Sequence, residues 1–209
     1  MILGIDIGNT NIVLGCIDNG EIRSIVRLHT DLHATSAEYA IRLRQILDLY
    51  DIDPQGFEGA ILSSVVPPVS AVMLAAVKKV TGVTCMVVGP GMKTGLNVRI
   101  DDPGTLAGDL LVGGVAALSC YGAPAIVMDL GTATTITVVD RDGAFRGGAI
   151  LPGVKLGFRA LAAGMGYENA GAYMIFGLVG VNFLIELAIN IVLCPVIVRL
   201  IRIGKKEVR

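Results

Sequence analysis

The sequence has few aromatic and few charged side chains, and each shortage excludes a class of protein. It contains no tryptophan and only 5% aromatic residues, so it lacks the stacking surfaces of proteins that bind single-stranded nucleic acid. Charged residues make up 17% of the chain and sum to a formal net charge of −1. Without a basic footprint, we expect no nucleic-acid partner. The 53% of hydrophobic residues also excludes intrinsic disorder.

Cysteine is scarce as well. The four cysteines lie far apart at Cys16, Cys85, Cys120 and Cys194, and no C-x-x-C pair occurs. This pattern excludes a zinc ribbon and a disulfide scaffold and fits a reducing compartment. The first residues also show no basic leader and no cleavage site. We therefore expect a cytoplasmic protein whose 209 residues suffice to bury a substantial core.

One long apolar run stands out near the end of the chain. Residues 173–198 carry a single charged side chain, Glu186, and five basic residues follow in 199–209. As a helix, ~26 residues would extend about 39 Å, more than the ~30 Å of a hydrocarbon core. Positive charge beside such a helix stays on the cytoplasmic side. The run predicts a membrane-spanning anchor, and a helix buried within a soluble protein is the alternative.

The preceding residues alternate strand and helix patterns, which is typical of an α/β protein. An Asn19-Gly20 pair between two strand patterns predicts a tight hairpin. Thr35 or Ser36, with Glu38 in the first turn, predicts the start of a helix. The patterns predict strands at residues 1–5, 12–17, 21–28, 60–66, 84–88, 125–129, 136–139 and 144–150, and helices at 35–50, 69–80, 104–120 and 156–163.

An internal repeat lies within this pattern. A strand ending in Asp6-x-Gly8 and followed by two more strands recurs as a strand ending in Asp129-x-Gly131, again followed by two strands. A carboxylate at a strand end can hold Mg²⁺, and glycine lets the backbone approach a phosphate closely. Because no G-x-x-x-x-G-K-[ST] motif occurs, the P-loop route to phosphate binding is excluded. A plain hairpin turn is the alternative for either copy alone.

Seven motifs in order make residues 1–163 resemble type III pantothenate kinases, members of the acetate-kinase/sugar-kinase/Hsp70/actin superfamily. The motifs are Asp6-Ile7-Gly8-Asn9-Thr10-Asn11, Arg27-Leu28-His29-Thr30-Asp31, Ser63-Ser64-Val65-Val66-Pro67, Gly89-Pro90-Gly91-Met92-Lys93-Thr94-Gly95-Leu96-Asn97, Asp101-Asp102-Pro103, Asp129-Leu130-Gly131-Thr132-Ala133-Thr134-Thr135 and Gly147-Gly148-Ala149-Ile150-Leu151-Pro152-Gly153. The resemblance implies a ribonuclease H-like, actin-like ATPase fold. It implies a first domain at 1–118 and an incomplete second domain at 119–166. The apolar helix with its basic cytoplasmic flank is expected at 167–209.

The same resemblance implies a function and a set of site residues. The activity would be ATP-dependent phosphorylation of pantothenate to 4′-phosphopantothenate, the first step of coenzyme A biosynthesis, in a homodimer. Asp109 would be the catalytic base, Asp6 would lie near Mg²⁺, and Asp129 would bind K⁺ or NH₄⁺. The implied ATP contacts are Asp6, Ile7, Gly8, Asn9, Thr10, Asn11, Ile12, Val13 and Thr132. The implied pantothenate contacts are Ala107, Gly108, Asp109 and Leu110.

Two departures from the family pattern raise other readings. Leu110 stands where the family has an arginine in the pantothenate site, and the loss of a charge-assisted contact weakens binding. The residues after about 164 do not match the family, and 190–203 weakly resemble the last transmembrane helix of an energy-coupling-factor transporter subunit. The alternatives are a degenerate nucleotide-binding module with little turnover, or a kinase-like passenger fused to a transporter segment.

Three other candidate sites are weaker. His29 and His33 have the i, i+4 spacing of helical metal ligands, but their surroundings read as a loop without a third ligand. Asp101 and Asp102 could bind metal, although a turn explains them better. Lys93 is either a functional cation or a solvated loop lysine.

Overall fold

The computed structural model describes residues 1–166, 169 and 185. By its internal contacts the chain divides into two compact units. One consists of residues 1–129 and 135–150, and the other of residues 130–134 and the described residues from 151 on.

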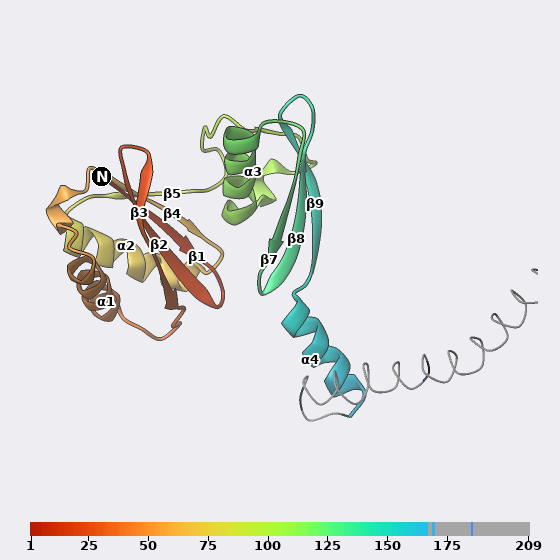
Figure 1. Ribbon diagram of the computed structural model, residues 1–209, viewed down its shortest axis with the longest axis horizontal. Helices are drawn as coiled ribbons and strands as arrows, with labels where there is room; N and C mark the ends of the chain where they lie inside the picture. The colour runs from red at the N-terminus through yellow and green to blue at the C-terminus, as the bar shows by residue number, and fades with distance from the viewer. Residues whose placement is uncertain (167–168, 170–184, 186–209) are drawn as a thin grey trace, which may run out of the picture. The chain divides into compact units, whose positions relative to one another are not determined.

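A five-stranded sheet forms the first half of the chain, in the order β3-β2-β1-β4-β5 (Figure 1). β1 pairs antiparallel with β2 and parallel with β4. Between β2 and β3, Asn19 and Gly20 both have positive φ angles, of 51° and 83°, so the predicted tight hairpin is confirmed. The strands are β1 (Ile2–Ile7), β2 (Asn11–Asp18), β3 (Glu21–His29), β4 (Gly59–Ser64) and β5 (Cys85–Val87).

Two helices bury one face of this sheet. Alternate residues of β1, namely Leu3, Ile5 and Ile7, point into a core that α1 (Ser36–Leu49) and α2 (Pro67–Thr81) complete. A capping box starts α1: Thr35 accepts from the N–H of Glu38, whose carboxylate accepts from the N–H of Thr35. A 3₁₀ turn, η1 (Pro54–Gly56), connects α1 to β4.

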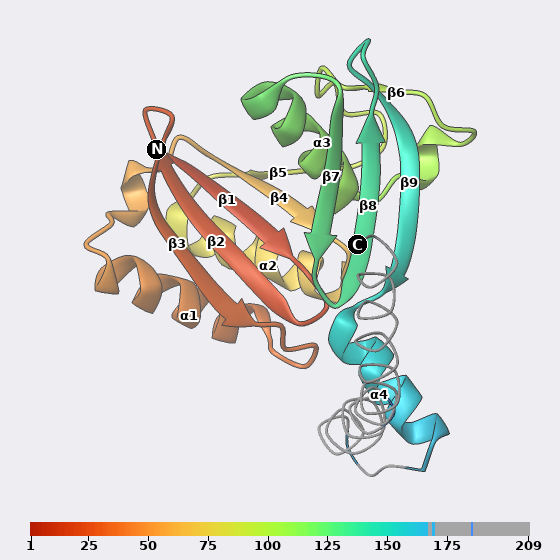
Figure 2. The same cartoon turned by 45° about the vertical axis from the view of Figure 1, so that its right-hand side comes forward.

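A four-stranded sheet follows, in the order β6-β9-β8-β7, and Figure 2 shows β7, β8 and β9 side by side. Helix α3 packs closely on this sheet at Gly114, where a Cβ would lie 3.2 Å from the Phe145 ring. The elements are β6 (Asn97–Val98), η2 (Pro103–Thr105), α3 (Gly108–Tyr121), β7 (Ala125–Leu130), β8 (Ala133–Val139), β9 (Ala144–Pro152) and α4 (Val154–Gly164).

The observed elements confirm the predicted α/β fold of the ribonuclease H-like, actin-like type. In both halves three consecutive strands lie side by side, as the internal repeat predicted. Several predicted boundaries were wrong by two or more residues, among them the start of β8, which is Ala133 rather than residue 136. The helix expected from residue 104 begins at Gly108, because Asp102 and Pro103 start the separate turn η2. The strand expected to reach residue 66 ends at Ser64, because Pro67 already begins α2.

The predicted membrane anchor at residues 173–198 lies outside the described residues, apart from Ile185. Among the residues that the structure does describe, no helix combines the length and the apolar character needed to cross a membrane.

Candidate functional site

The β1–β2 turn carries the first Asp-x-Gly motif and is held from two sides. The Gly8 N–H donates to the Asn11 carbonyl at 2.9 Å, and a Cβ at Gly8 would lie only 3.2 Å from that oxygen. Just past the end of β3, the Thr30 N–H donates to the Thr10 carbonyl at 3.0 Å and the Thr30 hydroxyl donates to the Gly8 carbonyl at 2.7 Å. A buried threonine thus fixes the turn that follows Asp6.

Asp6 ends β1 beside Ser63 of β4, with which it is in register. Desolvation raises the pKa of the Asp6 carboxyl, the Ser63 hydroxyl opposes this, and the negative charges of Asp109 and Asp129 raise the pKa further. Ser63 is 5% exposed, and its hydroxyl makes no hydrogen bond of regular geometry with the described residues. The first unit therefore gathers three carboxylates, with no cation among the causes of the Asp6 shift.

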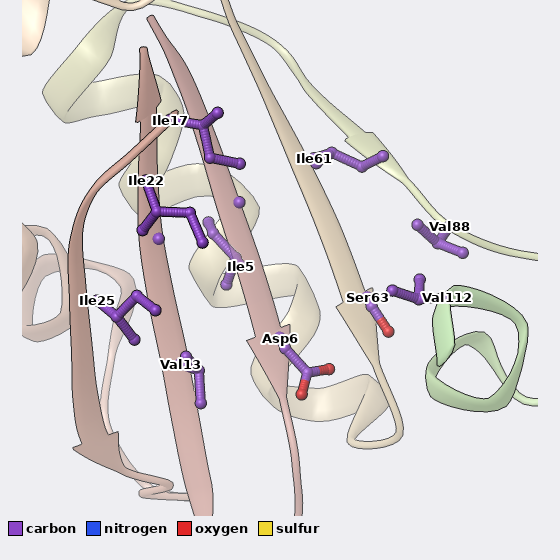
Figure 3. A pocket seen from close by; sticks show the side chains of 12 residues that line it. Ile5, Asp6, Val13, Ile17, Ile22, Ile25, Ile61, Ser63, Val88 and Val112 are labelled. Atoms are coloured by element: carbon purple, nitrogen blue, oxygen red, sulfur yellow. The ribbon is translucent and has the colours of Figure 1, made fainter. Parts of the chain in front are cut away.

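Asp6 and Ser63 also border an apolar cavity of about 300 Å³ on the sheet face opposite α1 and α2. Figure 3 shows that these are the labelled side chains with oxygen atoms, whereas the other labelled side chains are hydrocarbon. The remaining lining residues are Gly4, Ile5, Val13, Gly15, Ile17, Ile22, Ile25, Ile61, Val88 and Val112. Apolar side chains thus flank one side of Asp6, a residue that is itself exposed.

The N-terminus of α3 brings Asp109 to a second cavity. Gly108 packs against β4, since a Cβ there would lie 3.4 Å from the Ser63 hydroxyl oxygen. The Asp109 carboxylate accepts from the Leu110 N–H at 2.7 Å. The cavity, of about 310 Å³, is lined by Asp109, Leu110, Gly113, Val127, Met128, Asp129, Thr135 and Thr137. The structure therefore brings together Asp109, Leu110 and Asp129 from the predicted site.

The second Asp-x-Gly turn, between β7 and β8, repeats the backbone contact of the first. The Gly131 N–H donates to the Ala133 carbonyl at 3.0 Å. The Gly153 N–H donates to the Thr132 carbonyl at 3.1 Å, and a Cβ at Gly153 would lie 2.3 Å from that oxygen. Only glycine allows the start of α4 to approach the turn this closely.

The weaker candidates do not form sites. His29 ends β3 and His33 lies in the following turn, so the two do not share a helix face. Asp102 caps η2 by accepting from the Gly104 N–H at 3.0 Å. No group of three or more histidine, cysteine or acidic side chains is placed to hold a metal ion within the described part of the chain. Cys16, Cys85 and Cys120 are free thiols.

Two residues of the site were missed by reasoning from the sequence alone. Thr30 and Ser63 both lie within motifs shared with the family. Nothing in those motifs indicates that Thr30 contacts the β1–β2 turn or that Ser63 lies beside Asp6. Thr30 reaches the turn only because β3 pairs with β2, and Ser63 reaches Asp6 only because β4 pairs with β1. Only the strand register identifies these two contacts. Local sequence patterns do not specify the register between strands so far apart in the chain.

Comparison with known proteins gives matches over the same residues. Residues 2–166 match the model of the type III pantothenate kinase family. The type III pantothenate kinase of Bifidobacterium animalis subsp. lactis is 43% identical over 163 residues, covering 78% of this chain and 65% of the relative. That of Moorella thermoacetica is 41% identical over 163 residues, covering 78% of this chain and 64% of the relative. The chain thus spans less than two thirds of the length of these relatives.

Among solved structures there is also a more distant similarity. The ethanolamine utilization protein EutJ of Carboxydothermus hydrogenoformans is 18% identical, with a TM-score of 0.44, and the match covers 83% of this chain and 60% of that protein.

Proposed function

Because the chain belongs to the type III pantothenate kinase family, we propose that it transfers a phosphoryl group from ATP to the 4′-hydroxyl of pantothenate, forming 4′-phosphopantothenate for coenzyme A biosynthesis. The observation that carries the proposal is the approach of Asp6, Asp109 and Asp129 within one compact unit. Phosphoryl transfer depends mainly on positioning and on charge stabilisation, and this cluster supplies the groups that such positioning requires.

The β1–β2 turn is suited to hold the phosphates of ATP. Residues 6–13 place successive backbone groups around Gly8, where a side chain would crowd the Asn11 carbonyl. Glycine at that position leaves the backbone open to a bound anion. When bound through the phosphates, Mg²⁺ would neutralise their negative charge. The Asp6 carboxylate fits this ion, because it is an oxygen ligand on which two further carboxylates, Asp109 and Asp129, act electrostatically.

Asp109 is suited to act as the base. A carboxylate that accepts the hydroxyl proton of pantothenate is sufficient for this reaction class. Its place in the first turn of α3, facing a cavity of about 310 Å³, leaves room for a small substrate beside it. We assign the pantothenate contacts to Ala107, Gly108, Asp109 and Leu110. The side chain of Leu110 supplies no charge, so the carboxylate of pantothenate is expected to be held less tightly than by an arginine.

The second Asp-x-Gly turn supplies two further proposed contacts. Thr132 would contact ATP, and Asp129 would bind K⁺ or NH₄⁺ through its carboxylate. The enzyme is proposed to act in the cytoplasm as a homodimer. Free thiols at Cys16, Cys85 and Cys120 are consistent with a reducing compartment.

The test is the initial rate of pantothenate-dependent ADP formation by the full chain with Mg·ATP, in potassium and in sodium buffer. Asp109→Asn should lower kcat by about 10²–10⁴-fold, the usual contribution of a general base. The control is Asp101→Asn, an exposed loop carboxylate, which should leave the rate unchanged. Potassium should support activity that sodium does not. Equal rates for wild type and Asp109→Asn would remove Asp109 from the mechanism, and equal rates in both buffers would remove the cation role of Asp129.

A nucleotide-binding module with little turnover is the second candidate, and the observation that favours it is Leu110. ATP would then raise the melting temperature while no ADP forms in the presence of pantothenate.

A further inference from the structure

One row of residues crosses the open face of the five-stranded sheet at the level of Asp6. Strand register aligns Ser63 with Asp6, Asp6 with Val13, and Val13 with Arg27. Side chains aligned across neighbouring strands project to the same face. The next residue of β3, Leu28, packs against the core on the opposite face. Arg27 therefore shares a face with Asp6.

Arg27 is exposed and forms no ion pair with any other described residue. The second arginine of β3, Arg23, differs in this respect, because its guanidinium lies 3.4 Å from the carboxylate of Asp18. Arg42 and Arg44 of α1 are likewise paired with Asp31 and Asp48. Arg27 thus brings an uncompensated positive charge to the row that contains Asp6.

The spacing of the row matches an extended anion. Asp6 and Arg27 lie two strands apart, about 9.6 Å for a strand spacing of ~4.8 Å, with the small Val13 between them. A cation at that distance does not pair directly with Asp6, in keeping with the absence of arginine among the causes of the raised Asp6 pKa. The row therefore has a carboxylate suited to a metal beside Ser63 and a free guanidinium at its other end.

The position of Arg27 is also fixed relative to the phosphate turn. Thr30, three residues further along, donates its hydroxyl to the Gly8 carbonyl at 2.7 Å and its N–H to the Thr10 carbonyl at 3.0 Å. The end of β3 consequently cannot move away from the β1–β2 turn without breaking both hydrogen bonds.

We propose that Arg27 is a phosphate-binding residue, whose guanidinium contacts the phosphates of the nucleotide from the far end of this row. Guanidinium offers paired N–H donors that match phosphate oxygens. This inference rests on the proposed function, because it takes the β1–β2 turn as the nucleotide site.

The test is isothermal titration of Mg·ATP into the full chain and its variants. Arg27→Gln should raise the ATP dissociation constant about tenfold, which corresponds to about 1.4 kcal/mol. Arg27→Lys, which keeps the charge but not the paired donors, should give a smaller loss. Arg23→Gln is the matched control on the same strand and should bind ATP as the wild type does. Melting temperatures without nucleotide identify any variant that fails to fold.

The possible outcomes separate the two proposals. If the wild type binds ATP and Arg27→Gln binds it equally well, Arg27 is a solvated edge-strand arginine and the inference is wrong while the function stands. A loss of the same size in Arg23→Gln would also overturn it, since the effect would then belong to the net charge of β3. A wild type that does not bind ATP overturns the proposed function and this inference with it. If Arg27→Gln does not fold, equal binding by Arg27→Lys and wild type overturns the paired-donor contact.

Discussion

The five-stranded and four-stranded sheets both contain three consecutive strands, the first of which ends in an Asp-x-Gly turn, yet the covered face of the first sheet buries more side chains. In the first sheet, α1 and α2 bury Leu3, Ile7 and Leu62 completely. In the second sheet, α3 covers one face, where Phe145 and Val139 are the large side chains that are completely buried. The other face of each sheet is open: Ile22 and Ile25 on β3 are 63% and 61% exposed, and Ile126 and Met128 on β7 are 69% and 61% exposed.

This difference shows where the stability of the described residues resides. A buried aliphatic side chain contributes about 1.5–3 kcal/mol relative to an exposed one, so the first sheet has the larger share. The turn after Asp6 therefore connects two strands of the better packed sheet. Substitutions that act on the turn, on its core and on the open face of the second sheet should differ accordingly.

Among substitutions in the first sheet and its turn, Asp6→Asn should have the largest effect on activity. Loss of the carboxylate removes the proposed ligand of the metal, and loss of one such electrostatic contribution lowers kcat by about 10²–10³-fold. Initial rates measured beside Asp142→Asn, an exposed turn residue, would test this. A rate within a few-fold of wild type would show that this turn is not the phosphate site.

The same variant should be more stable than the wild type near neutral pH. The folded-state pKa of Asp6 lies above its ordinary value of 3.8, so the folded state binds this proton more tightly than the unfolded state does. The resulting penalty is absent below the unfolded pKa, grows as pH rises through the folded pKa, and is fully present above it. Melting curves from acidic to neutral pH should show the advantage of Asp6→Asn growing with pH. If the advantage instead shrinks as the pH rises, the pKa of Asp6 is not raised in the folded state.

Leu62→Ala should give the largest loss of stability. Leu62 is fully buried between the first sheet and its helices, and such truncations cost about 2–5 kcal/mol. Urea unfolding, monitored by circular dichroism, measures the free energy of unfolding. A cost below about 1 kcal/mol would show that the first sheet isn't the main source of stability.

Thr30→Val should have an intermediate effect. Valine keeps the shape but removes the hydroxyl that donates to the Gly8 carbonyl at 2.7 Å, which costs about 1 kcal/mol. ATP affinity should fall as well, because the turn loses one of its two anchors to Thr30. Thr84→Val, at an exposed threonine, is the control. Unchanged affinity in a folded Thr30→Val variant would mean that the hydrogen bond from the Thr30 hydroxyl to Gly8 does not position the turn.

Ile126→Ala should have the smallest effect. Because this side chain is 69% exposed, its truncation should change the free energy of unfolding by less than about 0.5 kcal/mol. The same urea titration as for Leu62→Ala gives the comparison. A loss as large as that of Leu62→Ala would show that something covers this face of the second sheet in solution.

Local sequence patterns predicted most of the elements correctly, because their signals lie within a few residues. The Asn19-Gly20 hairpin and the capping box of Thr35 and Glu38 are examples. The short strand β6 was not predicted. Its two residues, Asn97 and Val98, pair in parallel with Ala144 and Phe145, and nothing within two residues of sequence indicates a partner so far along the chain.

The candidate site divides in the same way. Asp6, Asp109 and Asp129 were predicted from the family motifs. In the structure Asp109 and Asp129 line one cavity, and Gly108, next to Asp109, packs against Ser63 beside Asp6. Thr30, Ser63 and Arg27 belong to the site through strand register alone, which depends on long-range pairing. Sequence reasoning therefore found the acidic groups and missed the residues that surround and support them.

The most direct test of the account is product analysis by mass spectrometry after the full 209-residue chain is incubated with pantothenate, Mg·ATP and K⁺. The expected result is 4′-phosphopantothenate in many-fold molar excess over protein, with one ADP formed for each product molecule. ATP binding without 4′-phosphopantothenate, or ADP formed without it, would contradict the claim that the protein transfers a phosphoryl group from ATP to pantothenate.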